Sequence, residues 1–379
     1  MKNIYFDYAA SMPTDPEVIS AIEPYLSEKF ANASSPHRLG REAQKALEDS
    51  RERLAKLIGA KPQEIIFNSG ATEANNHAII GVACALKSKG QHIIVSPIEH
   101  HSVFEPIEFL RREGFKITCL PVDEDGLVDP QEVKGAITSE TILIAVMLAN
   151  NEIGTVQPVA EIGKISREKN IPFLVDAVQA VGHIPVNIEE LKADLVSLSA
   201  HKFYGPKGVG ALYVRKGVKI EPLLRGGDQE GSRRASTQNV AGIVGMAKAI
   251  DLCEKKMSQE AQAQGMWRTR LLEEIPKRID GVRVNGHATK RLPNNAHFSF
   301  EKISGESLLM SLDMIGIAAS MGSACTSGAI APSHVLRAIG LSDDWAMGSL
   351  RITLGRWNTN EDIEYLLEHL PKIVKTLRI

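Results

Sequence analysis

The sequence has few cysteines, no long apolar run and little net charge of either sign. Its four cysteines among 379 residues lie far apart, without a C-x-x-C pair, which argues against a zinc knuckle or a disulfide framework. The longest apolar run, residues 142–149, is far shorter than the roughly 20 residues that a transmembrane helix needs. The 44 basic and 46 acidic residues leave a net charge of −2, so we expect neither membrane association nor direct binding of nucleic acid.

Three further signals are missing. Asp7 interrupts the N-terminus before an apolar signal segment can form, so we expect a cytoplasmic protein. The sequence contains neither G-x-G-x-x-G nor G-x-x-x-x-G-K-[ST], which excludes the common dinucleotide and nucleoside-triphosphate loops. No Cys/His cluster has ligand spacing, so no metal site is expected. With 43% apolar and 24% charged residues, the chain reads as an ordinary globular protein of about two to three domains.

Between about residues 60 and 215, short β-branched runs alternate with helical patterns. Strands that read as continuous apolar runs between helices predict an α/β fold with a mostly parallel sheet covered on both faces. In such sheets, ligands bind at the carboxyl ends of the strands. The expected strands are 65–67, 92–95, 117–122, 142–148, 173–175, 195–198 and 210–214, and the expected helices are 72–86, 103–112, 130–137 and 159–169.

The second half of the chain has a different pattern. A long helix over 239–278 precedes strands at 282–284 and 296–300, a helix near 306–314 and a terminal helix over about 361–377. This remainder predicts a smaller α+β domain. We expect a large domain over residues 15–250 and a small domain formed by 1–14 and 251–379.

Two groups of polar residues follow expected strands. Ser69-Gly70-Ala71-Thr72-Glu73 opens a helix, where a hydroxyl and N–H groups suit a phosphate, although taken alone a plain cap by Thr72 is the favoured interpretation. Asp176 ends one buried run with Gln179 three residues later, and Ser199-Ala200-His201-Lys202 ends another. Pyridoxal phosphate needs a lysine for its aldehyde, an acid for its ring nitrogen and an anion cup for its phosphate. All three parts are present.

Two other motifs carry possible chemistry. His100, in Glu99-His100-His101, could stack on a flat ring and shuttle protons, whereas His101 reads as a surface residue. Cys325 lies in the loop Gly322-Ser323-Ala324-Cys325-Thr326-Ser327-Gly328, whose small residues suit an exposed, reactive thiol; on composition alone a reactive and a structural cysteine are about equally supported. The other cysteines, Cys84, Cys119 and Cys253, read as packing residues.

The arginines permit two interpretations. Arg351 and Arg356 lie in an apolar stretch, and an arginine directed into a site can bind a carboxylate through two hydrogen bonds. The alternative is an arginine whose charged end reaches the surface, which could explain one of the two but explains both less well. The pair Arg233-Arg234 is weak support for a nucleic-acid patch in a neutral chain.

Taken in order, these motifs resemble the cysteine desulfurases of the NifS/IscS family. The resemblance extends from residue 5 to residue 356. Its specific elements are Tyr5 to Ala10, Ser69 to Glu73, Asn150-Asn151-Glu152-Ile153-Gly154, Val175 to Gln179, Ser199 to Lys202, the Cys325 loop and Pro332-Ser333-His334-Val335-Leu336.

The resemblance implies a fold-type-I pyridoxal phosphate enzyme, usually a homodimer, that removes sulfur from L-cysteine and leaves L-alanine. It implies that Lys202 holds the cofactor and moves the α-proton, that Asp176 pairs with the ring nitrogen and that Cys325 receives the sulfur as a persulfide. The other implied contacts are Gln179 to the ring hydroxyl, His100 stacked on the ring, Ala71, Thr72, Ser199 and His201 at the phosphate, Thr237 lent by the partner subunit, and Asn151 with Arg351 at the substrate carboxylate.

Two departures from the family pattern stand out. The chain reads Arg234-Ala235-Ser236-Thr237 where the family has glycine before the threonine, so Thr237 is the least secure phosphate ligand. The chain also ends at Ile379, without the tail that docks a scaffold protein in housekeeping members, which favours a NifS-like or specialised role. The resemblance also implies a protein sulfur acceptor, whose identity the sequence does not name, that serves iron–sulfur cluster assembly, tRNA thiolation or DNA phosphorothioation.

Other functions remain open at this point. A selenocysteine lyase or a cysteine sulfinate desulfinase would keep Lys202 and Asp176 but would not need Cys325 in the same way. A sulfur-carrier protein that had lost the chemistry would have no reason to keep Lys202, Asp176, His100 and Cys325 together.

Overall fold

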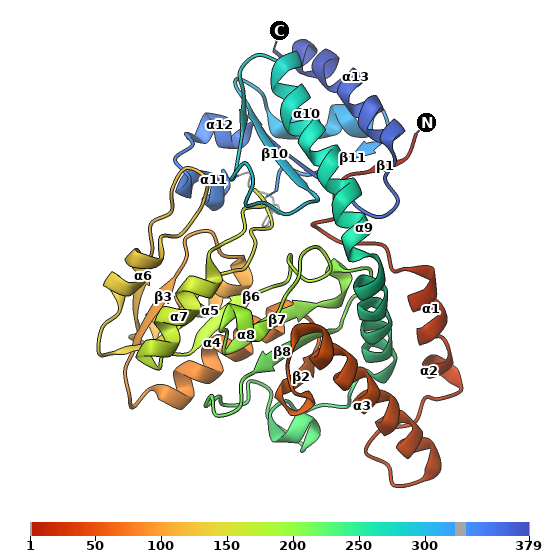
Figure 1. Ribbon diagram of the computed structural model, residues 1–379, viewed down its shortest axis with the longest axis vertical. Coiled ribbons are helices and arrows are strands. Elements are labelled where there is room, and N and C mark those ends of the chain that lie inside the picture. Colours follow the sequence, from red (N-terminus) through yellow and green to blue (C-terminus); the bar gives the residue numbers. More distant parts are fainter. Residues whose placement is uncertain (1, 323–330, 379) are drawn as a thin grey trace.

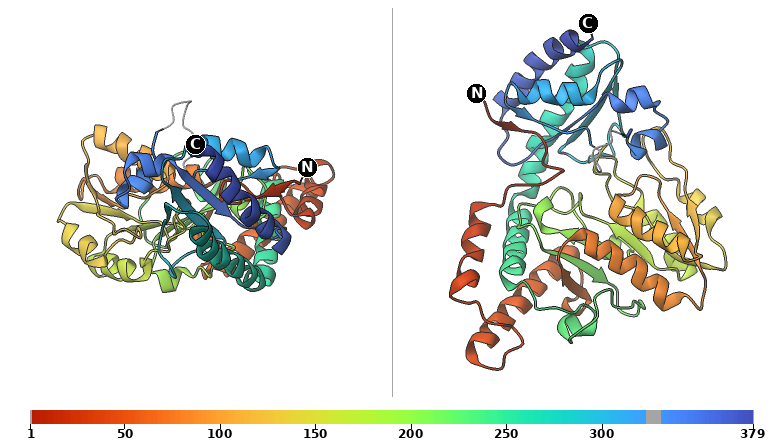
Figure 2. Two further views of the ribbon diagram at one scale, coloured as in Figure 1. Left: turned by 90° about the horizontal axis from the view of Figure 1, so that it is seen from above. Right: turned by 180° about the vertical axis from the view of Figure 1, so that it is seen from behind.

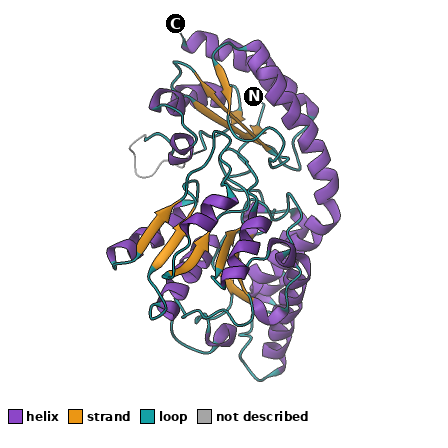
Figure 3. Cartoon of the chain, turned by 60° about the vertical axis from the view of Figure 1, so that its left-hand side comes forward, coloured by secondary structure: helices purple, strands orange, loops and turns teal. Residues whose placement is uncertain are grey.

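The computed structural model describes residues 2–322 and 331–378. The described chain forms a larger and a smaller body joined by one long helix, and both termini lie on the smaller body (Figure 1, Figure 3). The larger body contains a seven-stranded sheet and the smaller one a three-stranded sheet with an additional strand pair.

The large sheet has the order β2-β8-β7-β6-β5-β3-β4. From β7 to β4 every neighbouring pair is parallel, and only β8 runs antiparallel to its neighbours β2 and β7. The mostly parallel sheet predicted from the apolar runs is therefore confirmed. The strands are β2 (Ile65–Asn68), β3 (His92–Val95), β4 (Lys116–Cys119), β5 (Thr141–Ala145), β6 (Phe173–Asp176), β7 (Leu195–Ser199) and β8 (Gly210–Val214).

Helices cover both faces of this sheet (Figure 2). On one face Ile79 and Ile107 belong to a core with Ile93 and Leu143, whereas on the other Leu54 and Ile162 pack with Val175. Apolar burial on both faces explains why the strands have almost no alternation. The helices around the sheet are α3 (Arg38–Ile58), α4 (Ala71–Leu86), α5 (His101–Arg112), α6 (Pro130–Ala136), α7 (Val159–Lys169) and α8 (Ile188–Leu191), with single 3₁₀ turns η1 (Pro62–Glu64), η2 (Ala200–Lys202) and η3 (Gln229–Ser232).

The smaller body is built from both ends of the chain. Its sheet has the order β12-β10-β9, and β1 pairs with β11 in parallel. Phe6, Phe298 and Leu367 lie in its separate apolar core. Its elements are β1 (Ile4–Tyr5), β9 (Val282–Val284), β10 (Asn295–Phe300), β11 (Ile317–Ala318), β12 (Ser349–Thr353), α10 (Gly305–Asp313), α11 (His334–Ala338), α12 (Asp343–Met347) and α13 (Asn360–Leu377).

The 39-residue helix α9 (Val240–Arg278) connects the two bodies. Ile243 and Met246 belong to the core of the large sheet, whereas Leu271 and Ile275 belong to the core of the smaller body. The short helices α1 (Pro16–Ile22) and α2 (Pro24–Ser27) pack beside it. The expected domain limit at residues 250–251 falls inside α9 and stays a prediction. No helix in the described ranges is long and apolar enough to cross a membrane.

Cys84 and Cys119 depart from the sequence analysis. Cys253 is buried, as expected for a packing residue, but the other two are exposed. Cys119 lies on β4, which is an edge of the large sheet and is only partly covered. An edge strand gives less burial than the apolar sequence around it suggests.

Candidate active site

A cavity of about 880 Å³ lies between the carboxyl edge of the large sheet and the smaller body. Ten of the predicted site residues line it. Thr237 is not part of its lining, and Cys325 falls outside the described residues. The lining residues that the sequence predicted are Ala71, Thr72, His100, Asn151, Asp176, Gln179, Ser199, His201, Lys202 and Arg351.

Lys202 ends the turn η2, directly after strand β7. Its Nζ donates hydrogen bonds to the carbonyl oxygens of Ala9 and Ala10, at 2.5 and 2.7 Å. Burial and then the nearby Arg351 guanidinium lower the pKa of the Lys202 ammonium to about 8, although the Asp7 and Asp176 carboxylates act in the opposite direction. A neutral amine, which is the nucleophilic form, is therefore accessible near neutral pH.

Asp176 is the last residue of β6 and is buried. Its two carboxylate oxygens accept hydrogen bonds from Asn75 Nδ2 at 2.8 Å and from the Val178 N–H at 3.0 Å. Gln179, one turn later, donates from Nε2 to the Ala9 carbonyl at 3.0 Å. A carboxylate has about four lone-pair sites, so Asp176 can still accept a hydrogen bond from an N–H group of a ligand in the cavity.

His100 caps the N-terminus of α5. Its Nδ1 accepts the Ser102 N–H at 3.0 Å and contacts the Ser102 hydroxyl at 2.8 Å. Enclosure by the cavity walls lowers the pKa of His100, with Lys202 acting in the same direction and Asp176 against it. A neutral ring with Nδ1 as acceptor carries its proton on Nε2.

The N-terminus of α4 forms a candidate phosphate cup. Gly70 precedes the helix with φ +147°, and its Cα lies only 2.6 Å from where a side-chain carbon on Gly210 would be. This close approach explains the small residues in the motif. The first N–H groups of a helix have no acceptor within it, and hydroxyls of Thr72 and Ser199 and the His201 ring line the same region.

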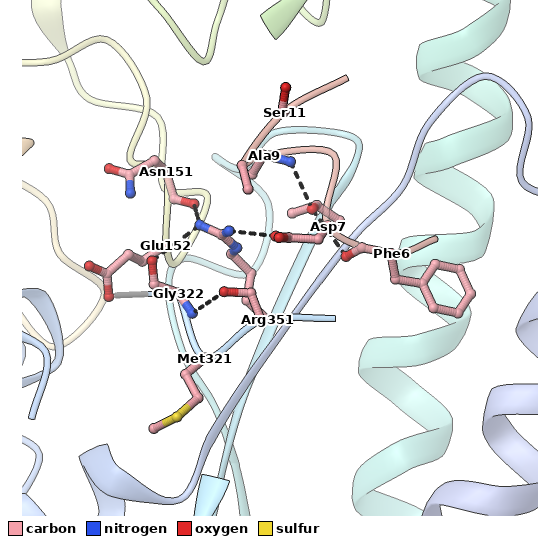
Figure 4. Close-up of polar contacts among 12 residues, drawn as sticks. Phe6, Asp7, Ala9, Ser11, Asn151, Glu152, Met321, Gly322 and Arg351 are labelled. Carbon is pink, nitrogen blue, oxygen red and sulfur yellow. Dashed lines mark hydrogen bonds and ion pairs between the residues drawn. The ribbon is translucent and has the colours of Figure 1, made fainter. Parts of the chain in front are cut away.

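Arg351 on β12 is buried and reaches the cavity from the smaller body (Figure 4). Its Nη2 pairs with Asp7 Oδ1 at 2.7 Å, and its Nη1 donates to the carbonyl oxygens of Asn151 and Gly322 at 2.9 and 3.3 Å. Its Nε has no hydrogen-bond partner among the described residues. Arg351 thus has N–H groups beyond those used in these contacts, which makes it a candidate for binding a carboxylate.

Two buried glutamates also line the cavity. Glu99 accepts a hydrogen bond from the Met147 N–H at 2.7 Å, and burial raises the pKa of Glu99 to about 8. Glu152 accepts the Ser333 hydroxyl at 2.5 Å, and burial likewise raises the pKa of Glu152. Protonation lets both carboxyl groups stay in a site of low polarity.

The described residues on either side of the Cys325 segment are fixed to the cavity wall. Before it, the Met321 carbonyl accepts the Ser349 hydroxyl at 3.1 Å and contacts His297 Nε2 at 3.4 Å. After it, His334 Nε2 contacts the Glu99 carbonyl at 2.9 Å. Described residues on both sides of the segment, Met321, Gly322 and His334, therefore line the cavity.

Thr237 is exposed and does not line the cavity. The preceding Ser236 has φ +97°, the left-handed region in which glycine is usual. A serine thus adopts here a backbone conformation that glycine adopts more readily. Arg234 pairs with Glu73 on α4 through contacts of 2.7 and 3.1 Å, so it stabilises the fold rather than a nucleic-acid patch.

The structure adds four polar residues that the sequence analysis did not single out: Asp7, Ser102 and Lys207 line the cavity, and the buried Asn75 bonds Asp176 from behind it. Asp7 appeared there only as a charge that interrupts the N-terminus and within the motif that carried the resemblance, and Asn75, Ser102 and Lys207 were not considered. Each is an ordinary polar residue in its own sequence context. His101, expected at the surface, is exposed but lines the cavity, with its ring centroid 5.1 Å from that of His334.

Comparison with known proteins gives the family. Residues 4–366 match the family described as aminotransferase class-V. The chain belongs to this family. A cysteine desulfurase IscS from Dictyoglomus turgidum is 54% identical over 377 residues, covering 100% of this chain and 96% of the relative. This relative confirms the predicted resemblance to the NifS/IscS group.

Two solved structures are also similar. One, described as a NifS-like protein, has a TM-score of 0.93 and 38% identity, covering 99% of this chain and 100% of its own. The other, described as SspA in complex with cysteine, has a TM-score of 0.84 and 36% identity, covering 94% of this chain and 100% of its own. The predicted fold type I is therefore confirmed.

Enzymes of this family use pyridoxal phosphate. The cavity of this chain contains the donor set that the group requires: an amine of lowered pKa, a buried carboxylate and a helix N-terminus with hydroxyls. A side-chain carbon on Gly70 would meet only Ser199 Oγ, at 3.7 Å, so the start of α4 is open toward the hydroxyl that lines the cavity. The residues present fit this cofactor.

Proposed function

We propose that this chain is a cysteine desulfurase in which Lys202 holds pyridoxal phosphate and Cys325 receives the sulfur. One observation carries the proposal: Lys202, Asp176 and Arg351 come from three distant segments and line a single cavity. The cysteine-bound structure named above and the desulfurase names of the relatives support L-cysteine as substrate.

Pyridoxal phosphate supplies an aldehyde carbon that takes an amine and a ring that withdraws electrons from the neighbouring bonds. Lys202 would hold the aldehyde and afterwards act as the base at the substrate's α-carbon, since its pKa of about 8 leaves part of the amine neutral. Asp176 would keep the ring nitrogen protonated, and Gln179 would face the ring hydroxyl. Ala71, Thr72, Ser199 and His201 would hold the phosphate.

Arg351 and Asn151 would orient the substrate through its carboxylate. The Cys325 thiolate would then attack the substrate sulfur. An S–S bond forms, the Cβ–S bond breaks with its electron pair remaining on carbon, and protonation of that carbon gives alanine. His100, stacked on the ring, would assist the proton transfers.

A homodimer completes this proposal. Thr237 would contribute to the phosphate cup of the partner subunit, because it lies away from the cavity of its own subunit. The persulfide on Cys325 would pass to a protein sulfur acceptor.

The test is sulfide and alanine production from L-cysteine by the purified protein with pyridoxal phosphate and a thiol reductant. Cys325→Ala is expected to keep the yellow cofactor and lose at least about 100-fold of sulfide release, because no other residue supplies the attacking thiolate. Cys119→Ala, which also removes an exposed thiol, should retain activity. Normal turnover by Cys325→Ala would instead favour a selenocysteine lyase or a cysteine sulfinate desulfinase.

A further inference from the structure

A continuous chain of hydrogen bonds joins Asp176 to His100 through two residues with no assigned role. Asn75 lies on the second turn of α4 and is fully buried, and Ser102 lies on the first turn of α5 and is 6% exposed. Asn75 Nδ2 donates to Asp176 Oδ2 at 2.8 Å and to Ser102 Oγ at 2.9 Å. Ser102 Oγ lies 2.8 Å from His100 Nδ1.

The donors and acceptors in this chain have one consistent arrangement. Asp176 accepts a backbone N–H on its other oxygen and presents an acceptor to Asn75, so the Asn75 amide must face it with nitrogen rather than oxygen. The second N–H of Asn75 Nδ2 donates a hydrogen bond to the Ser102 hydroxyl oxygen. Ser102 Oγ is thereby an acceptor toward Asn75, and its own proton is free to be donated.

The His100 end completes the arrangement. Nδ1 accepts the backbone N–H of Ser102 at 3.0 Å, so it carries no proton, and the only hydrogen between it and Ser102 Oγ is that of the hydroxyl. His100 therefore has its proton on Nε2. A proton added to Nδ1 would face two hydrogen-bond donors, which disfavours protonation. Burial, and then the charges of Lys202, His101 and His334, also lower the pKa of His100, whereas Asp176 raises it.

The side-chain oxygen of Asn75 provides evidence that this arrangement has a functional role. Asn75 Oδ1 is buried and has no hydrogen-bond partner in the described chain. An unpaired buried acceptor destabilises a fold, and such groups concentrate at functional sites. The two hydrogen bonds that Asn75 Nδ2 donates, to Asp176 and Ser102, are therefore the role we assign to this amide.

We propose that Asn75 and Ser102 are positioning residues that couple Asp176 to His100, holding the carboxylate in place and keeping His100 neutral with Nε2–H available to the cavity. The proposal rests on the proposed function, since it assigns these residues to the same reaction. Neither residue needs to touch the substrate.

The experiment compares Asn75→Ala, Ser102→Ala and Ser102→Thr in the cofactor-loaded protein. In 15N-histidine NMR, the wild-type His100 should show an unprotonated Nδ1 and a protonated Nε2. Both alanine variants should raise the pKa of His100 by on the order of half a pH unit, because a network of hydrogen bonds transmits the loss of either member. Ser102→Thr, which keeps the hydroxyl, should restore the wild-type titration.

Kinetics and absorbance give independent readouts. We expect kcat to fall about tenfold in both alanine variants with KM within about twofold, because alignment at the reacting centre is lost while the substrate contacts remain. Asn75→Ala should also shift the pH midpoint of the cofactor absorbance, since Asp176 loses a donor. Ser166→Ala serves as the control. It removes a buried hydroxyl that donates to the Ile171 carbonyl and does not line the cavity, so it should change neither the His100 titration nor the absorbance midpoint.

The outcomes separate this proposal from the function it rests on. If wild-type protein released no sulfide or alanine, the proposed function would fail, whereas the NMR titration would still test the coupling. If wild-type protein were active but Asn75→Ala left the His100 titration unchanged, the coupling proposed here would be wrong.

Discussion

At the scale of single residues, Lys202 provides the clearest pH dependence. Burial lowers its pKa to about 8, so below that pH the neutral fraction rises about tenfold per unit. We expect the rate at which cofactor-free protein takes up pyridoxal phosphate to rise steeply between pH 6 and 8, on the order of tenfold per unit, and to level off above. Stopped-flow absorbance at the visible band measures it.

Arg351→Gln provides the control for this prediction. The Arg351 guanidinium is the second cause of the low Lys202 pKa, so its removal should move the midpoint to higher pH. A rate that is independent of pH, or a midpoint that moves down in the variant, would contradict the assignment.

A second residue-scale prediction concerns Ser236. Its φ of +97° is strained for a side-chain-bearing residue, at a cost of about 1–3 kcal/mol. Ser236→Gly should relieve this strain and, after the added flexibility of the unfolded chain, raise the free energy of unfolding by about 1 kcal/mol. Urea denaturation measures the difference; a less stable glycine variant would show that the serine is held without strain.

Single residues also show what the sequence could foretell. Lys202 and Asp176 were found because Asp176 ends one buried strand and Lys202 lies three residues beyond another, and ligands bind at these ends in parallel sheets. Asp7 and Asn75 were not found, because their partners Arg351 and Asp176 lie 344 and 101 residues away and only the fold brings each pair together. Ser102 lies two residues from His100, but a serine at that position is too common to indicate a contact. Sequence spacing carries no signal for the first two contacts.

At the scale of elements, α9 offers a matched pair of glycines. A side-chain carbon on Gly265 would meet nothing within 4 Å, whereas one on Gly245 would lie 2.5 Å from Ile22 Cδ1. Gly265→Ala should stabilise the protein by about 0.5–1 kcal/mol through helix propensity. Gly245→Ala should destabilise it by about 1–3 kcal/mol, because α1 packs too closely there. Thermal unfolding of both variants checks this, and equal effects would refute the packing described for α1 and α9.

The elements themselves were largely predictable. Strands β3 and β8 have the predicted bounds, and α9 differs by one residue, because apolar runs and helical periodicity are strong over these stretches. The sequence analysis did not assign α3, although Ala43, Leu47 and Leu54 are buried at helical spacing. Helices α11 and α12 have five residues each, too few for a periodic pattern.

At the scale of the whole molecule, the site depends on elements from both bodies. Asp7 and Arg351 belong to the smaller body, and they face Lys202 across the cavity. The sequence analysis assigned these residues to the same active site only through the family resemblance. Their meeting depends on α9, which fixes one body against the other.

The dimer provides a prediction at this scale. Thr237→Ala should weaken pyridoxal phosphate binding about tenfold, as expected for loss of a hydrogen bond to a charged phosphate, while the dimer stays intact. Equilibrium titration with sedimentation checks both. Ser232→Ala, an exposed serine of the same segment, serves as control. A stable monomer with full activity would contradict the role given to Thr237.

The most direct measurement is to locate the lysine that holds the cofactor. Protein loaded with pyridoxal phosphate is reduced with borohydride, digested and analysed by mass spectrometry. We predict that the pyridoxyl group lies on the peptide containing Lys202, and that Lys202→Ala abolishes it together with alanine formation. Because Lys207 also lines the cavity, labelling there with Lys202 unmodified would contradict the central claim.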